Sequence, residues 1–140
     1  MPQEDFLKKQ IDKLGQVLGK VLTALTGLKM GDDIKNAIEA IDQTLKEQLG
    51  LRIHDLTEIP RENFMVTLQE NKNLSDNNLE ILADILFSLA VETGYQEEDS
   101  EENRKLLERS LIILQYLEKE SATYSFERNY KIEEIQNILS

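Results

Sequence analysis

Residues 75–94 read SDNNLEILADILFSLAVETG, and the rest of the predicted architecture is built around this segment. Ten of the thirteen residues in 79–91 are apolar, and on a helix they leave only a thin polar strip. A helix that is apolar on nearly every side needs neighbours on nearly every side, so we expect it to lie at the centre of the protein. Ser75 is the expected N-cap of this helix, and Gly94 marks its expected end.

The sequence on both sides of this stretch predicts further helices, because apolar residues recur every three or four positions. In the first helix these residues form one broad stripe, and Gly27 follows its end. Its apolar residues are Phe6, Leu7, Ile11, Leu14, Val17, Leu18, Val21, Leu22 and Leu25. Residues 51–59 are expected to be a connector. The six predicted helices span roughly residues 4–26, 32 or 33 to 48, 60–70, 75–94, 101–119, and the segment after Ser125.

The breaks between these helices are short, and short breaks place consecutive helices side by side in antiparallel hairpins. No alternating pattern of β-branched residues predicts a strand. At 140 residues the chain is long enough to bury a hydrophobic core as one domain. We therefore predict a single all-α domain over residues 1–140, with about six helices stacked as antiparallel hairpins.

The charge and composition of the chain argue against several classes of function and location. The formal net charge is −11, and residues 51–100 hold 3 basic and 11 acidic side chains. Such a surface repels phosphate backbones, so we expect no binding to nucleic acid. No run of about eighteen apolar residues predicts a membrane span, and the acidic Glu4 and Asp5 argue against a secretory signal. The absence of cysteine fits a reducing cytoplasm, where we expect the protein to be.

The two ends of the chain resemble a known family. The segments QEDFLKKQIDKLGQVLGKVLTALTGLK (residues 3–29) and YLEKESATYSFERNYKIEEIQNIL (residues 116–139) are similar to a family of small bacterial proteins classed as a domain of unknown function. The last three helices also resemble a degenerate tetratricopeptide-type (TPR-like) array, which lacks the Trp and Pro that mark such repeats. The resemblance implies a helical fold and a bacterial cytoplasmic setting, and it implies no activity or site.

Few residues of the chain offer catalytic or metal chemistry. His54, beside Asp55, is the only histidine and the one candidate for a general base. Adjacent residues rarely point at one another, so an enzyme with a site around His54 is the weaker alternative. With one His and no Cys, the usual structural zinc sites are excluded. We therefore predict no catalytic residue, no cofactor and no metal.

A cluster of acidic residues precedes and begins the fifth predicted helix: Glu97, Glu98, Asp99, Glu101 and Glu102. This run lacks the ligand spacing of a calcium loop, so we expect a solvated loop that could hold Ca²⁺ only weakly. Glu101 and Glu102 also suit the first turn of a helix. The acidic charge would suit a basic peptide as a partner.

Two glycines point to a close contact of the first helix. Gly15 and Gly19 lie four residues apart on one flank, next to the apolar stripe, and each costs about 1 kcal/mol relative to Ala in a helix. This cost is tolerable where another backbone approaches closely. The partner is either a helix of the same chain or the same helix of a second subunit.

The first helix has a second interpretation as a membrane-surface helix. Lys9, Lys13 and Lys20 lie opposite its apolar stripe, as in helices that lie on lipid. The acidic remainder of the chain is repelled by anionic lipid, so we do not expect membrane contact.

The last predicted hairpin carries three aromatic residues, Tyr124, Phe126 and Tyr130. They could anchor a bound peptide, but we expect Phe126 and Tyr130 to pack the last helix onto the preceding one. The sequence as a whole predicts a non-catalytic helical module that binds a protein or peptide partner or forms a homo-oligomer.

Overall fold

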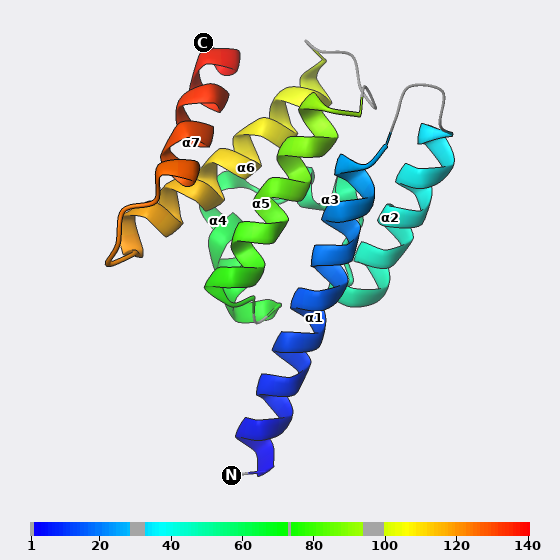
Figure 1. Ribbon diagram of the computed structural model, residues 1–140, viewed down its shortest axis with the longest axis vertical. Helices are drawn as coiled ribbons and strands as arrows, with labels where there is room; N and C mark the ends of the chain where they lie inside the picture. The colour runs from blue at the N-terminus through cyan, green and yellow to red at the C-terminus, as the bar shows by residue number, and fades with distance from the viewer. Residues whose placement is uncertain (1, 29–32, 73, 94–99) are drawn as a thin grey trace.

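The computed structural model describes residues 2–28, 33–72, 74–93 and 100–140 (Figure 1). These residues form helices and no strand, so the predicted all-α fold of about six helices is confirmed. The helices are α1 (Pro2–Thr26), α2 (Ile34–Leu49), α3 (Ile53–Glu58), α4 (Arg61–Val66), α5 (Asp76–Val91), α6 (Glu101–Glu120) and α7 (Phe126–Leu139), and the π-helical turn η1 (Thr67–Asn71) continues α4.

Helix α5 lies at the centre, as its sequence predicts. Ten of its sixteen residues are buried, and α1 and α6 flank it on two sides (Figure 1). On the α6 side the two backbones come close enough for the buried Ser110 hydroxyl to donate a 2.8 Å hydrogen bond to the Ala83 carbonyl. The buried apolar side chains of the described residues belong to one cluster, so α5 organises one core.

Side chains cap the starts of several helices, and the predicted N-cap Ser75 is one of them. The Ser75 side chain accepts a hydrogen bond from the Asn78 amide, and Ser125 caps α7 in the same way. Asp33 caps the start of α2, and Gly50 follows its last residue. Gly50 has a φ of 74°, a left-handed conformation that glycine adopts without steric cost.

The prediction that residues 51–59 form a connector is wrong, because the six-residue helix α3 lies within them. Asp42 of α2 caps this helix from outside: its carboxylate accepts hydrogen bonds from the Ile53 amide at 2.7 Å and from the Arg52 guanidinium at 3.0 Å. Asp55 closes the same turn by accepting from the Arg52 amide at 2.9 Å. A helix this short has too few residues for an apolar period to be recognised.

Consecutive helices α5, α6 and α7 form antiparallel hairpins (Figure 1). The first hairpin is different. Helix α1 runs in the same direction as α5 and packs mainly against it, whereas its contact with the antiparallel α2 is sparse (Figure 1). Small side chains, Ala37 and Ala40, face Val17 and Val21 there and leave an open furrow of about 420 Å³ between α1 and α2.

Only the second half of α1 belongs to the core. Leu18, Val21 and Leu25 are buried, whereas Phe6 and Leu7 are 61% and 50% exposed. The first turns of the helix extend beyond the body of the protein (Figure 1). The apolar stripe that the sequence predicts is therefore covered over part of its length and faces solvent over the rest.

Candidate functional site

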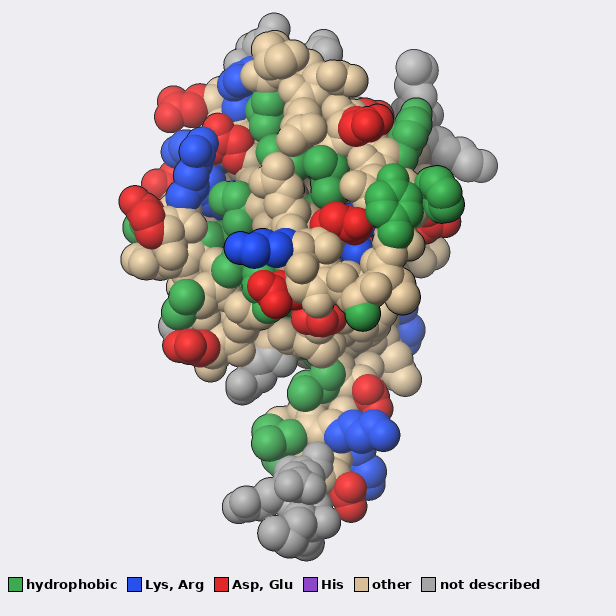
Figure 2. Space-filling model, turned by 90° about the vertical axis from the view of Figure 1, so that its left-hand side faces the viewer, with side chains coloured by type: hydrophobic (Ala, Val, Ile, Leu, Met, Phe, Trp, Pro, Cys, Tyr) green, Lys and Arg blue, Asp and Glu red, His purple; other side chains and the backbone are tan. Residues whose placement is uncertain are grey.

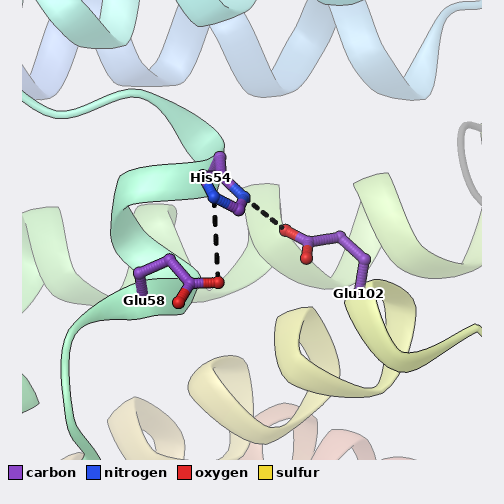
Figure 3. Close-up of side chains that lie close together, drawn as sticks. All are labelled: His54, Glu58 and Glu102. Carbon is purple, nitrogen blue, oxygen red and sulfur yellow. Dashed lines mark hydrogen bonds and ion pairs between the residues drawn. The ribbon is translucent and has the colours of Figure 1, made fainter.

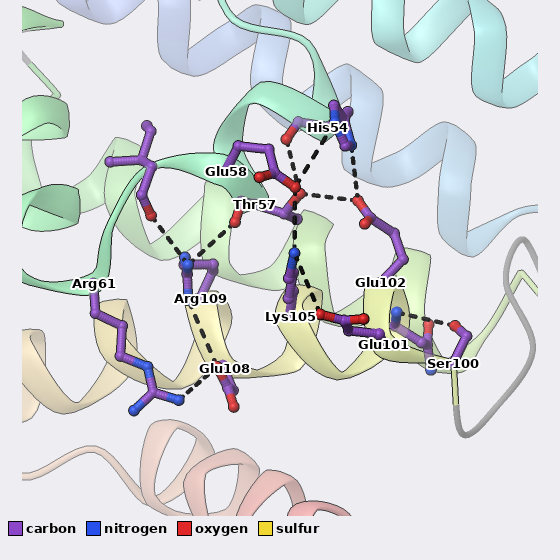
Figure 4. Close-up of polar contacts among 12 residues, drawn as sticks. His54, Thr57, Glu58, Arg61, Ser100, Glu101, Glu102, Lys105, Glu108 and Arg109 are labelled. Atoms are coloured by element: carbon purple, nitrogen blue, oxygen red, sulfur yellow. Dashed lines mark hydrogen bonds and ion pairs between the residues drawn. The ribbon is translucent and has the colours of Figure 1, made fainter.

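A row of polar side chains lies between α3 and the first turns of α6 (Figure 4). His54 stands at one end of this row, between Glu58 of α3 and Glu102 of α6 (Figure 3). Its Nδ1 atom lies 3.4 Å from Glu102 Oε1, and its Nε2 atom lies 3.8 Å from Glu58 Oε1. His54 and Glu58 share one face of α3 because they are four residues apart.

Thr57 positions the Glu102 carboxylate from the α3 side. Its side chain is buried, and its Oγ1 atom lies 2.9 Å from Glu102 Oε1 and 2.7 Å from the His54 carbonyl oxygen. A hydroxyl has one proton and donates it to one of these acceptors at a time. Glu102 is thus held between a buried hydroxyl and an imidazole, both on α3.

Lys105 is the cation nearest to these carboxylates (Figure 4). Its Nζ atom lies 3.2 Å from Glu58 Oε1 and 3.8 Å from Glu101 Oε1. The pKa of Lys105 is raised above its ordinary value, chiefly because Glu58 accepts a hydrogen bond from it. Lys105 therefore stays charged and offsets part of the negative charge beside His54.

Arg109 fastens the far end of α3 to α6. The residue is buried, and its Nη2 atom donates to the carbonyls of Thr57 at 3.1 Å and Ile59 at 3.0 Å. Its guanidinium carbon lies 5.6 Å from the centroid of the Phe64 ring, and its Nη1 atom is 3.6 Å from Glu108. A cation at the carbonyl end of a helix is favourable, so this contact stabilises the short α3 in place.

The sequence pair His54–Asp55 is not a structural pair. Asp55 turns to the Arg52 amide, and the carboxylates that meet His54 are those of Glu58 and Glu102. The His54 side chain is 69% exposed, so water has free access to the imidazole. The arrangement can accept a proton or ligate a cation, because it brings one imidazole and two carboxylates together.

The predicted acidic cluster is only partly described. Glu97, Glu98 and Asp99 lie outside the described residues. Glu101 is exposed in the first turn of α6 beside Lys105, and Glu102 faces α3. The two described acids therefore point to different partners.

The two glycines of α1 have different surroundings. A Cβ atom on Gly15 would lie 2.7 Å from Asn78 Oδ1, and the buried Asn78 also donates a 3.1 Å hydrogen bond to the Ile11 carbonyl. Gly15 therefore lets α5 of the same chain approach α1. A Cβ on Gly19 would meet no described atom within 4 Å.

The first turns of α1, residues 5–11, are called the arm here. A groove of about 570 Å³ lies where the arm meets the body. Among the described residues it is lined by four apolar side chains, three lysines, two glutamines and no acid: Phe6, Leu7, Lys9, Gln10, Ile11, Lys13, Leu14, Gln48 and Lys72. Figure 2 shows the arm below the body, with green side chains on one side of it and blue and red side chains on the other.

A second apolar surface, here called the aromatic face, is formed by Tyr124, Phe126 and Tyr130. Phe126 is 81% exposed and Tyr130 is 71% exposed, and the rings of Tyr124 and Phe126 meet edge to face at 5.1 Å. Figure 2 looks from the α7 side and shows hydrophobic side chains gathered on the body above the arm. The prediction that Phe126 and Tyr130 pack the last helix inward is therefore wrong.

Helix α7 is attached to the body mainly by other residues. Ile132 and Ile135 enter the core. Arg128 contacts Glu80 of α5 at 3.1 Å, and Lys131 contacts Asp84 of α5 at 2.6 Å. Because these cations hold the inner side of α7, the aromatic rings are left on its outer side.

Sequence reasoning missed Thr57, Glu58 and Lys105. The His54-x-x-x-Glu58 spacing was the one available signal, and it lay inside the segment predicted to be a connector. The contact between His54 and Glu102 joins distant parts of the chain, and no local pattern marks it.

No helix in the described part of the chain is both long and apolar enough to cross a membrane. Comparison of the chain with protein-family models, with curated proteins and with solved structures finds no match. Two resemblances therefore stay predictions: that of the two chain ends to a bacterial family, and that of the last three helices to a TPR-like array.

Proposed function

We propose that this protein is a non-catalytic helical module of the bacterial cytoplasm that associates with itself. In the proposed contact, the arm of one copy docks on the aromatic face of a second copy. The observation that carries this proposal is the exposure of Phe6 and Leu7 on a helix whose second half packs into the core through Leu18, Val21 and Leu25.

The exposed hydrophobic side chains of the arm support the proposal. Leu7 and Ile11 lie four residues apart on the line that Leu18 and Leu25 continue into the core, and along this line Ile11 is partly exposed and Leu7 is half exposed. A helical end without packing is only marginally stable in water. A partner that covers the stripe would stabilise the arm and remove apolar surface from water.

Charge complementarity favours a second copy as the occupant. Lys9, Lys13 and Lys72 line the groove beside the arm. On α7 the exposed Glu127 and Glu133 lie three residues before and after Tyr130, so they flank the aromatic rings. An apolar stripe bordered by lysines is thus complementary to an aromatic surface bordered by glutamates.

The surfaces are small, so the association is expected to be weak. One helical arm and three rings fall toward the low end of interface sizes, where complexes form transiently. Exposed aromatic side chains that become buried carry most of the energy of such a contact. We expect a reversible equilibrium that depends on protein concentration.

Sedimentation velocity over a wide range of protein concentrations tests the proposal. The mass should rise above 16.2 kDa as concentration increases. Leu7→Glu and Phe126→Ser should each weaken the association at least about tenfold. Val66→Ser is the matched control, because Val66 is 52% exposed on α4, outside both surfaces. A monomer at every concentration overturns the proposal.

A charge exchange tests the pairing of the two surfaces directly. The Lys9→Glu/Lys13→Glu variant and the Glu127→Lys/Glu133→Lys variant should each associate poorly alone, because like charges then meet. An equimolar mixture of the two should associate again. Failure of the mixture, together with Leu7-dependent binding to anionic vesicles, would favour the membrane-surface alternative instead.

A further inference from the structure

We propose that His54, Glu58 and Glu102 bind one divalent transition-metal ion of the Zn²⁺ class between α3 and α6. This proposal is independent of the self-association above, because it uses other residues and another face of the fold. Imidazole and carboxylate groups are ligands that Zn²⁺ takes in proteins, and three protein ligands leave one position for water.

The spacing of the ligand atoms fits one ion. One nitrogen of His54 and one oxygen from each glutamate all lie within 4.8 Å of one another. Ligands on a tetrahedral Zn²⁺, at bond lengths near 2.0–2.1 Å, lie about 3.3 Å apart. The 3.4 Å between His54 Nδ1 and Glu102 Oε1 already matches this separation. Glu58 is half exposed, so its side chain can turn to the same nitrogen without disturbing the core.

Two of the three ligands lie on α3, a short helix that is held in place at both ends. His54 and Glu58 stand on one face of α3, whose start is capped by Asp42 and whose end is held by Arg109. The Glu102 carboxylate is oriented by the buried Thr57 hydroxyl at 2.9 Å. Hydrogen bonds of this kind from outside the ligand set orient metal ligands and raise their affinity.

The local charge also favours a cation. Two carboxylates with oxygens within 4.8 Å of one another repel, and Lys105, which contacts one of them, offsets this repulsion only in part. A divalent ion would neutralise both carboxylates. Lys105 then acts as a competitor for Glu58, since an ammonium group and a metal ion seek the same oxygen atoms.

The experiment is a titration of the full chain, freed of metal by a chelator, with Zn²⁺ alone, followed by calorimetry and by NMR. The chain contains one histidine, so the imidazole signals in the spectrum belong to His54. We expect one Zn²⁺ per chain and a shift of those signals that saturates at the same ratio.

Four variants locate the site. His54→Ala and Glu102→Gln should each lower the Zn²⁺ affinity at least tenfold, and Thr57→Val should lower it about tenfold, while circular dichroism shows each variant folded. Lys105→Gln should raise the affinity, which a purely structural role of Lys105 would not do. Glu39→Gln, an exposed acid on α2, is the matched control and should bind as the parent does.

Two results would overturn the proposal. The first is the absence of saturable Zn²⁺ binding to the parent chain, which would identify the three residues as an ion-pair cluster only. The second is an affinity that His54→Ala leaves unchanged, which would place the ion elsewhere on the acidic surface.

Discussion

Helices α5 and α1 are neighbours that run in the same direction, yet their burial differs. The apolar side chains of α5 are covered along nearly the whole helix, whereas those of α1 are covered from Leu18 onward. Both sequences show a clear apolar pattern. Such a pattern therefore predicts which face of a helix must be buried, but does not indicate whether the same chain or a second molecule buries it.

The largest expected effect is the difference in stability between a substitution in the core of α5 and one in the arm of α1. Leu86 of α5 is fully buried, so Leu86→Ala should lower the free energy of unfolding by about 2–5 kcal/mol. Leu7→Ala in the arm should change it by less than about 0.5 kcal/mol in a dilute, monomeric sample, because Leu7 is already in water. Urea unfolding of both variants measures this difference. Similar losses would mean that the arm is packed within one copy.

Substitutions of Gly15 and Gly19 are expected to have opposite effects on stability, because only Gly15 lies against α5. Gly15→Ala places a methyl group 2.7 Å from Asn78 Oδ1 and should cost about 1 kcal/mol, since the shift of Asn78 weakens its bond to Ile11. Gly19→Ala meets open space and should stabilise the fold by about 0.5–1 kcal/mol. Thermal unfolding shows whether the two signs are opposite. Equal shifts in melting temperature would contradict the close approach at Gly15.

The smallest expected effect is a change in the pH dependence of stability at Glu118, where α6 meets α7. The pKa of Glu118 is lowered from its ordinary value of 4.5 because Asn129 and then Arg128 donate hydrogen bonds to its carboxylate. This contribution to stability is present above pH 4.5 and is lost as the pH falls through the lowered pKa. Glu118→Gln should therefore lose less stability than the parent chain on acidification. Unfolding curves at several pH values measure this, and identical pH profiles would argue against the α6–α7 contact.

The parts of the fold that could be predicted are those that depend on local patterns. Ser75 caps its helix as expected, the last helix follows Ser125 as expected, and the central position of α5 follows from its apolar residues. Helix α3 was missed because a six-residue helix is shorter than two full turns and depends on Asp42, a residue of another helix.

The candidate sites depend on long-range packing, which explains what the sequence did not show. From the sequence alone, the ring of Phe126 could face either the core or the solvent. The ion pairs of Arg128 and Lys131 with α5 hold the opposite side of α7 against the body, so the ring faces outward. Likewise, Glu102 reaches His54 only because α6 packs across α3.

Amide hydrogen exchange along α1 distinguishes the half of this helix that packs in the core from the half that we propose is covered by a second copy. At a concentration where the chain is monomeric, amides of residues 7–11 should exchange almost without protection, and those of residues 19–26 should exchange far more slowly. Raising the concentration should slow exchange in residues 7–11 alone. Equal, strong protection of both segments in the monomer would show that the arm is packed within a single copy.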